Sequence, residues 1–199
     1  MDKKVVTDII NQLEDECGKT TVTTGQLYPY CGMVLKYEDD TVKIDMSDYI
    51  KGTIKDFPED CTKPVNTPAT THQFEVNEQQ TKLDQDKAKL FHTYVVKLLF
   101  VSKRGMPDIQ VAIAFLSTRI IVPDVDDWKN LLRLMMYLNA TKDLLLTLSI
   151  ESFHSAKWWV DASYATHPYC KGHTGGTMSL GKGSVYITSC KQKINARSL

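Results

Sequence analysis

The 199-residue sequence lacks several features that mark whole classes of protein. Its five cysteines are irregularly spaced and include no C-x-x-C pair, which argues against a disulfide scaffold and favours a reducing compartment. Lys97 interrupts the apolar run from 94 to 101, so no run reaches the length of a membrane span, and the N-terminus has no signal-peptide pattern. These absences predict an intracellular protein, cytoplasmic or nuclear, with no membrane partner.

The sequence also lacks an excess of charge of either sign. Its 24 Lys and Arg residues balance 24 Asp and Glu residues, so the formal net charge is zero at pH 7. A neutral chain has no overall electrostatic signature of nucleic-acid binding, and only local basic groups remain candidates. One such group consists of Lys182, Lys191, Lys193 and Arg197. There is no phosphate loop, dinucleotide fingerprint or G-x-S-x-G motif, so we expect no small-molecule cofactor.

The first third of the sequence contains helical and strand-like patterns. Residues 3 to 17 have apolar side chains at helical spacing, and Gly18 is placed to cap the end of that helix. Two strand-like runs follow, from 27 to 38 and from 41 to 46. Ser47 is placed to cap a short helix that comes next.

The middle of the sequence is a polar stretch followed by three helical patterns. Residues 58 to 85 contain three prolines and show no periodicity, which predicts a flexible linker. The clearest helix spans 86 to 104, and residues 107 to 121 are apolar nearly all round, which predicts a buried helix. A third helix begins near Asp124. Its inner face is apolar and consists of Trp128, Leu131, Leu132, Met135 and Leu138.

The stretch from 158 to 193 carries the most distinctive pattern. An apolar run leads to a single carboxylate, Asp161, and two further strand-like runs follow, separated by glycines. This arrangement predicts three antiparallel strands. A lone ionised carboxylate within a strand needs a partner or a metal ion, unless it lies at a strand end and caps a turn. The residues alone leave these two interpretations open.

This stretch resembles the start of the ribonuclease H region in the Pol polyproteins of copia-type retrotransposons. The resemblance continues upstream through PDIQVAIAFLSTR and YLNATKD, so it covers most of the chain. It implies an α+β fold made of a reverse-transcriptase remnant and a partial ribonuclease H-like sheet. The matching residues in the C-terminal stretch are Trp159, Asp161, Ala162, Ser163, His173, Thr174, Gly175, Gly176, Gly181, Lys191 and Gln192.

The resemblance also implies how the chain is divided. Residues 1 to 57 are expected to be the end of a reverse-transcriptase palm and the first thumb helix. Residues 58 to 85 are the linker, and residues 86 to 142 are a helical thumb and connection region. Residues 144 to 199 are expected to be an incomplete ribonuclease H-like domain. We expect this C-terminal third to be poorly stable, because a sheet face that carries Val185 and Ile187 lacks its cover.

The chemistry implied by the family depends on several carboxylates that hold two Mg²⁺ ions against an RNA–DNA hybrid. Asp161 matches the first of them, and it is the one catalytic and metal-binding residue that the resemblance carries over. The family's second carboxylate belongs to a motif that would begin near Asn195, where this sequence does not contain it. We therefore expect a fragment cut at both ends, without catalysis or a bound cofactor. The alternative is a domesticated module that binds nucleic acid or protein through an exposed sheet edge.

The sequence Y-E-D-D, from Tyr37 to Asp40, looks like the metal-binding hairpin of a reverse transcriptase. In the family, however, that hairpin precedes a Tyr-Leu-Gly landmark, which Tyr30, Cys31 and Gly32 resemble here. The Y-E-D-D sequence follows the landmark, and aspartate is also a favoured turn residue. We therefore expect Asp39 and Asp40 to be exposed turn residues without a catalytic role.

A second candidate metal site lies in the C-terminal stretch. His167, Cys170 and His173 follow an H-x2-C-x2-H spacing, and His154 and Cys190 are nearby in the sequence. Cysteine and histidine are the usual ligands of zinc. This is one irregular run and not a pair of knuckles, and the family does not use these positions as ligands. We expect polar turn residues here and no specific zinc site.

Overall fold

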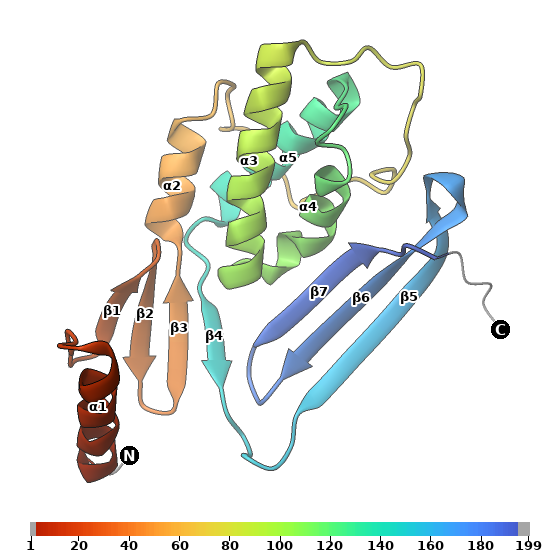
Figure 1. Cartoon of the computed structure of the whole chain (residues 1–199). Coiled ribbons are helices and arrows are strands. Elements are labelled where there is room, and N and C mark those ends of the chain that lie inside the picture. Colours follow the sequence, from red (N-terminus) through yellow and green to blue (C-terminus); the bar gives the residue numbers. More distant parts are fainter. Residues whose placement is uncertain (1–2, 195–199) are drawn as a thin grey trace.

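The computed structural model describes residues 3–194, and Arg197 of the expected basic group lies outside them. The chain forms helices and two separate antiparallel sheets, which confirms the α+β class (Figure 1). In sequence, one helix precedes the first sheet, and the helices from 47 to 141 lie between the third and fourth strands of that sheet. In space, these helices contact both sheets. Within the described residues, no helix is both long enough and apolar enough to cross a membrane.

The first sheet has four strands in the order β1-β2-β3-β4. The run expected from 27 to 38 is two strands and not one, because Cys31 and Gly32 turn the chain with φ values of 47° and 77°. The last strand comes from far along the chain and pairs with β3, with Ile44 opposite Leu146. The strands are β1 (Leu27–Tyr30), β2 (Met33–Glu38), β3 (Thr41–Asp45) and β4 (Leu146–Ser149).

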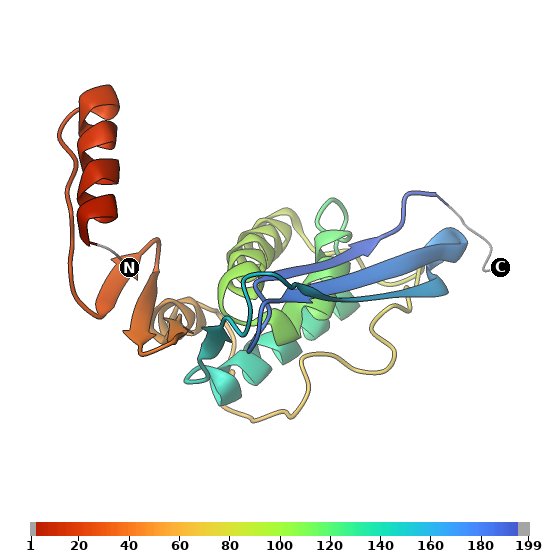
Figure 2. The same cartoon turned by 90° about the horizontal axis from the view of Figure 1, so that it is seen from below.

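The N-terminal helix α1 (Lys3–Cys17) extends away from the rest of the molecule (Figure 2). Its bounds and its glycine cap are as expected, since Gly18 has a φ of 82° and donates its N–H to the carbonyl of Glu14 at 2.9 Å. None of its residues is buried, and Val5 and Ile9 on its apolar side are about half exposed.

The central helices are α2 (Ser47–Lys55), α3 (Gln85–Arg104), the short 3₁₀ helix η1 (Pro107–Ile109), α4 (Gln110–Ser117) and α5 (Val125–Thr141). Ser47 begins α2 but does not cap it, because the carboxylate of Asp45 accepts both the N–H and the hydroxyl of Ser47, at 3.0 and 2.7 Å. The helix expected from 107 to 121 ends at Ser117, and Ile121 is 89% exposed. Its last turn tightens as Thr118 bonds back to Phe115 at 2.9 Å.

The start of α5 is held by a closed set of polar contacts. Asp124 accepts the N–H groups of Asp126 and Asp127 at 3.1 Å, and the Asp127 carboxylate accepts the N–H of Asp124 at 2.9 Å, which completes a capping box. Arg119 donates to both carboxylates, at 2.9 and 3.0 Å. The helix therefore begins where the sequence predicted, and its buried charges are paired.

The core of the molecule lies among these helices and is apolar. The inner face expected for α5 is buried except at Leu132, which is partly exposed. Apolar burial of this kind contributes roughly 25 cal/mol per Å² of surface removed from water. The largest side chains that are almost fully buried include Phe91, Leu98, Ile113, Phe115, Leu131, Leu134, Met135 and Leu138.

The segment expected to be a linker follows the surface of the helical core and is attached to it at several points. Trp128 donates its indole N–H to the carboxylate of Glu59. Further along, Asn139 donates to the carbonyl of Cys61 at 3.0 Å, and Phe74 packs against the core. Contacts of this kind, made with residues distant in sequence, leave no periodic pattern in the segment itself.

The second sheet is a three-stranded meander, as the sequence predicted, formed by β5 (Lys157–His167), β6 (Lys171–Ser179) and β7 (Tyr186–Lys191). The 3₁₀ turn η2 (Pro168–Cys170) joins the first two strands. Strand β7 packs against α4, whereas the outer edge of β5 pairs with no other strand in the described part of the chain.

The uncovered face of this sheet is different from the expected one. Ile187 is partly covered, because it faces α4, although Val185 is 40% exposed as expected. The outward face instead presents large side chains from β5 and β7, and the rings of Trp158 and Tyr186 lie 6.0 Å apart on it. The exposed apolar and aromatic residues of this face are Trp158, Val160, Tyr164 and Tyr186.

Candidate functional site

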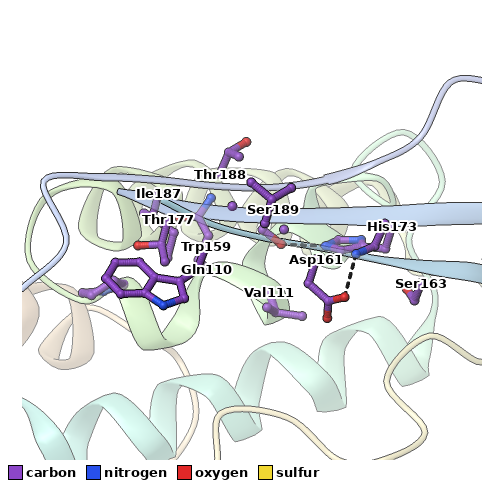
Figure 3. A pocket seen from close by; sticks show the side chains of 15 residues that line it. Gln110, Val111, Trp159, Asp161, Ser163, His173, Thr177, Ile187, Thr188 and Ser189 are labelled. Carbon is purple, nitrogen blue, oxygen red and sulfur yellow. Dashed lines mark hydrogen bonds between the residues drawn. The ribbon is translucent and has the colours of Figure 1, made fainter. Parts of the chain in front are cut away.

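The inner face of the second sheet gathers most of the residues that the sequence singled out. Alternate residues of a strand point to the same face, so the register defines three rows across the strands. The first row is Trp159, Thr177 and Ile187; the second is Asp161, Gly175 and Ser189; the third is Ser163, His173 and Lys191. Figure 3 shows the side chains of this face directed toward α4.

Asp161 lies near the middle of β5 on this face, so it does not cap a turn at a strand end. Its carboxylate accepts the N–H of Ala162 at 2.8 Å and is exposed to solvent. It makes no ion pair with any residue that the structure describes. Its neighbours on the face are Trp159, Ser163 and Gly175. Within residues 3–194, no three His, Cys, Asp or Glu side chains gather in a way that would hold a metal ion.

Two histidines beside Asp161 form a buried hydrogen-bonded chain with a serine. Nε2 of His167 lies 2.9 Å from Nδ1 of His173, whose Nε2 lies 2.6 Å from Oγ of Ser189. The rings of Phe74 and Phe115 pack against His167, with centroids 4.8 and 6.1 Å away. Burial lowers the pKa of His167 from 6.5 to about 4, helped by the neighbouring His173, and burial also lowers the pKa of His173. Both imidazoles are therefore neutral at pH 7.

The direction of this hydrogen-bonded series follows from its open end, because Nδ1 of His167 is buried and has no hydrogen-bond partner among the described residues. If Nε2–H of His167 donates to His173, then His173 donates its own Nε2–H to Ser189, and the unpaired atom is a lone pair. The reverse direction would leave a buried N–H unpaired, which proteins rarely tolerate. In the favoured direction Ser189 accepts a hydrogen bond from His173. The hydrogen bonds between His167, His173 and Ser189 therefore link the strands of the sheet and do not activate Ser189 as a nucleophile.

The residues considered as a candidate zinc site are only partly brought together. His167 and His173 use ring nitrogens to bond each other, so those nitrogens are not free for a metal ion. Cys170 is exposed in the turn with a φ of 55°, and Cys190 lies opposite Thr174 on the outward face. His154 is exposed in the loop before β5. The H-x2-C-x2-H spacing thus produces a histidine pair and a separate cysteine.

The Y-E-D-D sequence forms the hairpin between β2 and β3. Asp39 and Asp40 are exposed, as expected, and Asp39 occupies the left-handed region with a φ of 45°. The Glu38 side chain pairs with Lys43 across the hairpin. No third carboxylate approaches Asp39 and Asp40 within the described residues.

A pocket of about 530 Å³ lies between the inner sheet face and the start of α4 (Figure 3). The sequence-based prediction found Asp161 and the glycines in it but missed Gln110. That side chain is only 2% exposed, and its amide oxygen has no hydrogen-bond partner within residues 3–194. The available signal was that Gln110 is a lone amide at the start of an otherwise apolar helix.

Comparisons of the chain with protein-family models, with curated proteins and with solved structures gave no match. The geometry of the inner sheet face therefore carries any functional argument.

Proposed function

We propose that the chain is part of the Pol polyprotein of a copia-type retrotransposon, from the end of the reverse transcriptase to the start of ribonuclease H. The observation that carries this proposal is the pairing of two motifs that are apart in the sequence. W-V-D-A-S (159–163) on β5 runs beside H-T-G-G (173–176) on β6, with Asp161 opposite Gly175. An opening antiparallel meander with an acid on its first strand is what the resemblance implies for ribonuclease H.

The N-terminal part supports the same proposal. Three antiparallel strands followed by packed helices agree with a palm remnant in residues 1 to 57 and a thumb and connection region in 86 to 142. The fourth strand of that sheet, β4, joins it from the C-terminal part of the chain. The hairpin with Asp39 and Asp40 follows the landmark-like turn at Cys31 and Gly32. That order argues against the hairpin as a polymerase site.

The residues around Asp161 do not fit the pair of Mg²⁺ ions that the intact family uses. Mg²⁺ requires six oxygen ligands in octahedral geometry, and two-metal sites share several carboxylates between the ions. Beside Asp161 the sheet offers an indole, a hydroxyl and a glycine, from Trp159, Ser163 and Gly175. We therefore propose that the chain by itself has no nuclease or polymerase activity.

The direct test is cleavage of a labelled RNA–DNA hybrid by the purified chain with Mg²⁺ or Mn²⁺, alongside primer extension on an RNA template. We expect neither activity. Metal-dependent cleavage that disappears in Asp161→Asn would overturn the proposal of inactivity, and that isosteric variant also controls for a contaminating nuclease.

A second candidate function, a binding module, is favoured by the free edge of β5. This strand is long, pairs on one side only, and exposes Trp158, Val160 and Tyr164. Unpaired strand edges readily accept another extended chain. Anisotropy with a labelled RNA–DNA hybrid at increasing salt tests the nucleic-acid form, because phosphate contacts weaken steeply as salt rises. Binding that is absent at low salt would exclude that form.

A further inference from the structure

The pocket between the inner sheet face and α4 is open because of one residue without a side chain. Gly175 lies between Asp161 and Ser189 in the middle row, and a Cβ atom placed on it would meet no other atom within 4 Å. The hollow above Gly175 is therefore bounded by the side chains around it. Trp159 lies in the neighbouring row, and Val111 of α4 faces the sheet (Figure 3).

The polar groups of the pocket include two acceptors without strong partners. Asp161 accepts one hydrogen bond, from the N–H next to it in the chain, and has no cation partner among the described residues. The amide oxygen of Gln110 is buried and unbonded. A buried acceptor without a donor is costly, so a bound group that donates hydrogen bonds would be stabilised here. The charge of Asp161 favours a donor that is also a cation.

The ring of Trp159 further restricts which cation fits the pocket. Trp159 is 54% exposed, and Figure 3 shows its ring and the Asp161 carboxylate on the same side of the sheet. The face of an indole attracts cations, and a planar guanidinium both stacks on it and bonds a carboxylate through two N–H groups. An ammonium group lacks that planar fork. A magnesium ion binds oxygen ligands, and neither an indole nor a glycine has a side-chain oxygen to offer it.

We propose that the pocket formed by Trp159, Asp161, Gly175 and Gln110 binds a guanidinium group. The guanidinium stacks on Trp159 and donates to the carboxylate of Asp161. The amide oxygen of Gln110 supplies a further acceptor at the buried side of the pocket. Free arginine derivatives and arginine side chains in a peptide share this chemistry. The inference depends on the pocket and not on the retrotransposon origin, so either can fail without the other.

The test is a titration of the full chain with N-acetyl-arginine amide, followed by tryptophan fluorescence and by the amide NMR signals of Asp161 and Gly175. We expect saturable binding, with N-acetyl-lysine amide roughly tenfold weaker or worse. An acetylated and amidated Gly-Arg-Gly peptide forms the second arm. Tighter binding of the peptide than of the free derivative assigns the site to peptides, and equal binding assigns it to any guanidinium.

Matched variants test whether binding depends on the pocket or on other parts of the surface. Asp161→Asn and Trp159→Leu should each weaken binding, roughly tenfold for Asp161→Asn because a charge-assisted bond is lost. Gly175→Ala should weaken it by narrowing the hollow, at a position where the added methyl group contacts nothing. Trp158→Leu on the outward face and Asp39→Asn on the distant hairpin should leave it unchanged.

The inference would be overturned by no saturable response to the arginine derivative, by equal affinity for the lysine derivative, or by full affinity in Asp161→Asn with its circular dichroism unchanged. Displacement of the arginine derivative by Mg²⁺ at low concentration would also overturn it, because it would assign the pocket to a metal ion.

Discussion

The helical region and the C-terminal sheet bury different kinds of side chain. In the helices, most of the buried side chains are apolar, and Phe91, Ile113 and Leu134 are completely inaccessible to solvent. In the sheet, the buried side chains are the polar ones of His167, His173, Ser179 and Ser189, whereas the large apolar residues of β5 are exposed. One region is held by apolar packing, and the other by backbone ladders and a polar network.

This difference teaches what each region responds to. Apolar burial scales with the area removed from water and does not depend on pH. The stability of the helical core should therefore fall mainly when a substitution removes buried side-chain volume. A buried polar network depends on the protonation state of its members and on every partner being present. The two regions should therefore fail under different perturbations, and the following predictions are designed to separate them.

The largest effect on stability is expected from a substitution that leaves a cavity in the helical core. Leu134→Ala should lower the free energy of unfolding by about 2–5 kcal/mol, because Leu134 is fully buried and the structure around such a cavity relaxes only partly. Val160→Ala on β5, where the side chain is 71% exposed, should change it by less than about 0.5 kcal/mol. Urea unfolding followed by circular dichroism measures both, and equal losses would contradict the comparison.

The second prediction concerns pH. Because burial depresses the pKa of His167 to about 4 from 6.5, the unfolded chain binds a proton at a pH where the folded chain stays neutral. The free energy of unfolding should therefore be highest above pH 6.5, and it should fall by about 3 kcal/mol as the pH drops toward 4. Thermal unfolding measured across this range gives the profile.

Two variants make the pH prediction specific. His167→Gln removes one of the two buried imidazoles and should reduce the fall in the free energy of unfolding between pH 6.5 and 4, with the remainder due to His173. His154→Gln removes an exposed histidine and should leave the profile as in the unaltered chain. If His167→Gln retained the full pH dependence, His167 would not be its source.

A smaller difference is expected in local opening. The outer edge of β5 has no strand partner, and its large apolar residues gain little from burial, whereas α4 is buried on most sides. Amides of Lys157–His167 should therefore exchange at least about tenfold faster than those of Gln110–Ser117, which corresponds to about 1.4 kcal/mol. Hydrogen exchange read by mass spectrometry measures this, and equal protection would show that the sheet is as stable as the helices.

The smallest effect is expected at the hairpin, which lies outside both regions and provides a baseline. Asp39→Asn should alter stability by a few tenths of a kcal/mol at most, because asparagine also accepts a positive φ. Asp39→Val should cost about 1 kcal/mol or more, since a β-branched residue is strained there. Urea unfolding of both variants separates backbone strain from charge, and an equal cost for both would point to a role for the carboxylate.

Sequence reasoning succeeded where local rules decide the structure. The helix from residue 3 and its cap at Gly18, the start of α5 at Asp124, and the three C-terminal strands all follow from short-range patterns. It failed by a few residues where a local rule had a competitor. The Ser47 hydroxyl donates to Asp45 and so does not cap the helix. Cys31 adopts a turn conformation that divides a continuous strand pattern into two strands.

The candidate site was predictable only in part. Asp161 and the motif H-T-G-G were found by their residue types, and their alignment on neighbouring strands follows from a meander. Gln110 was missed, since its burial depends on α4 meeting the sheet. The histidine pair was considered as a metal site because spacing alone does not say which nitrogens already have partners.

By itself, the sequence determined the secondary structure and its order, because caps, glycine turns and apolar periodicity act over a few residues. Only the tertiary structure decided which segments meet. It paired β4 with β3 across the whole helical region, and it placed Phe74 from the polar segment against His167. Such contacts join residues far apart in the chain, and their free energy depends on burial and on partners that no local pattern encodes. For that reason the chemistry around Asp161 became visible only in the fold.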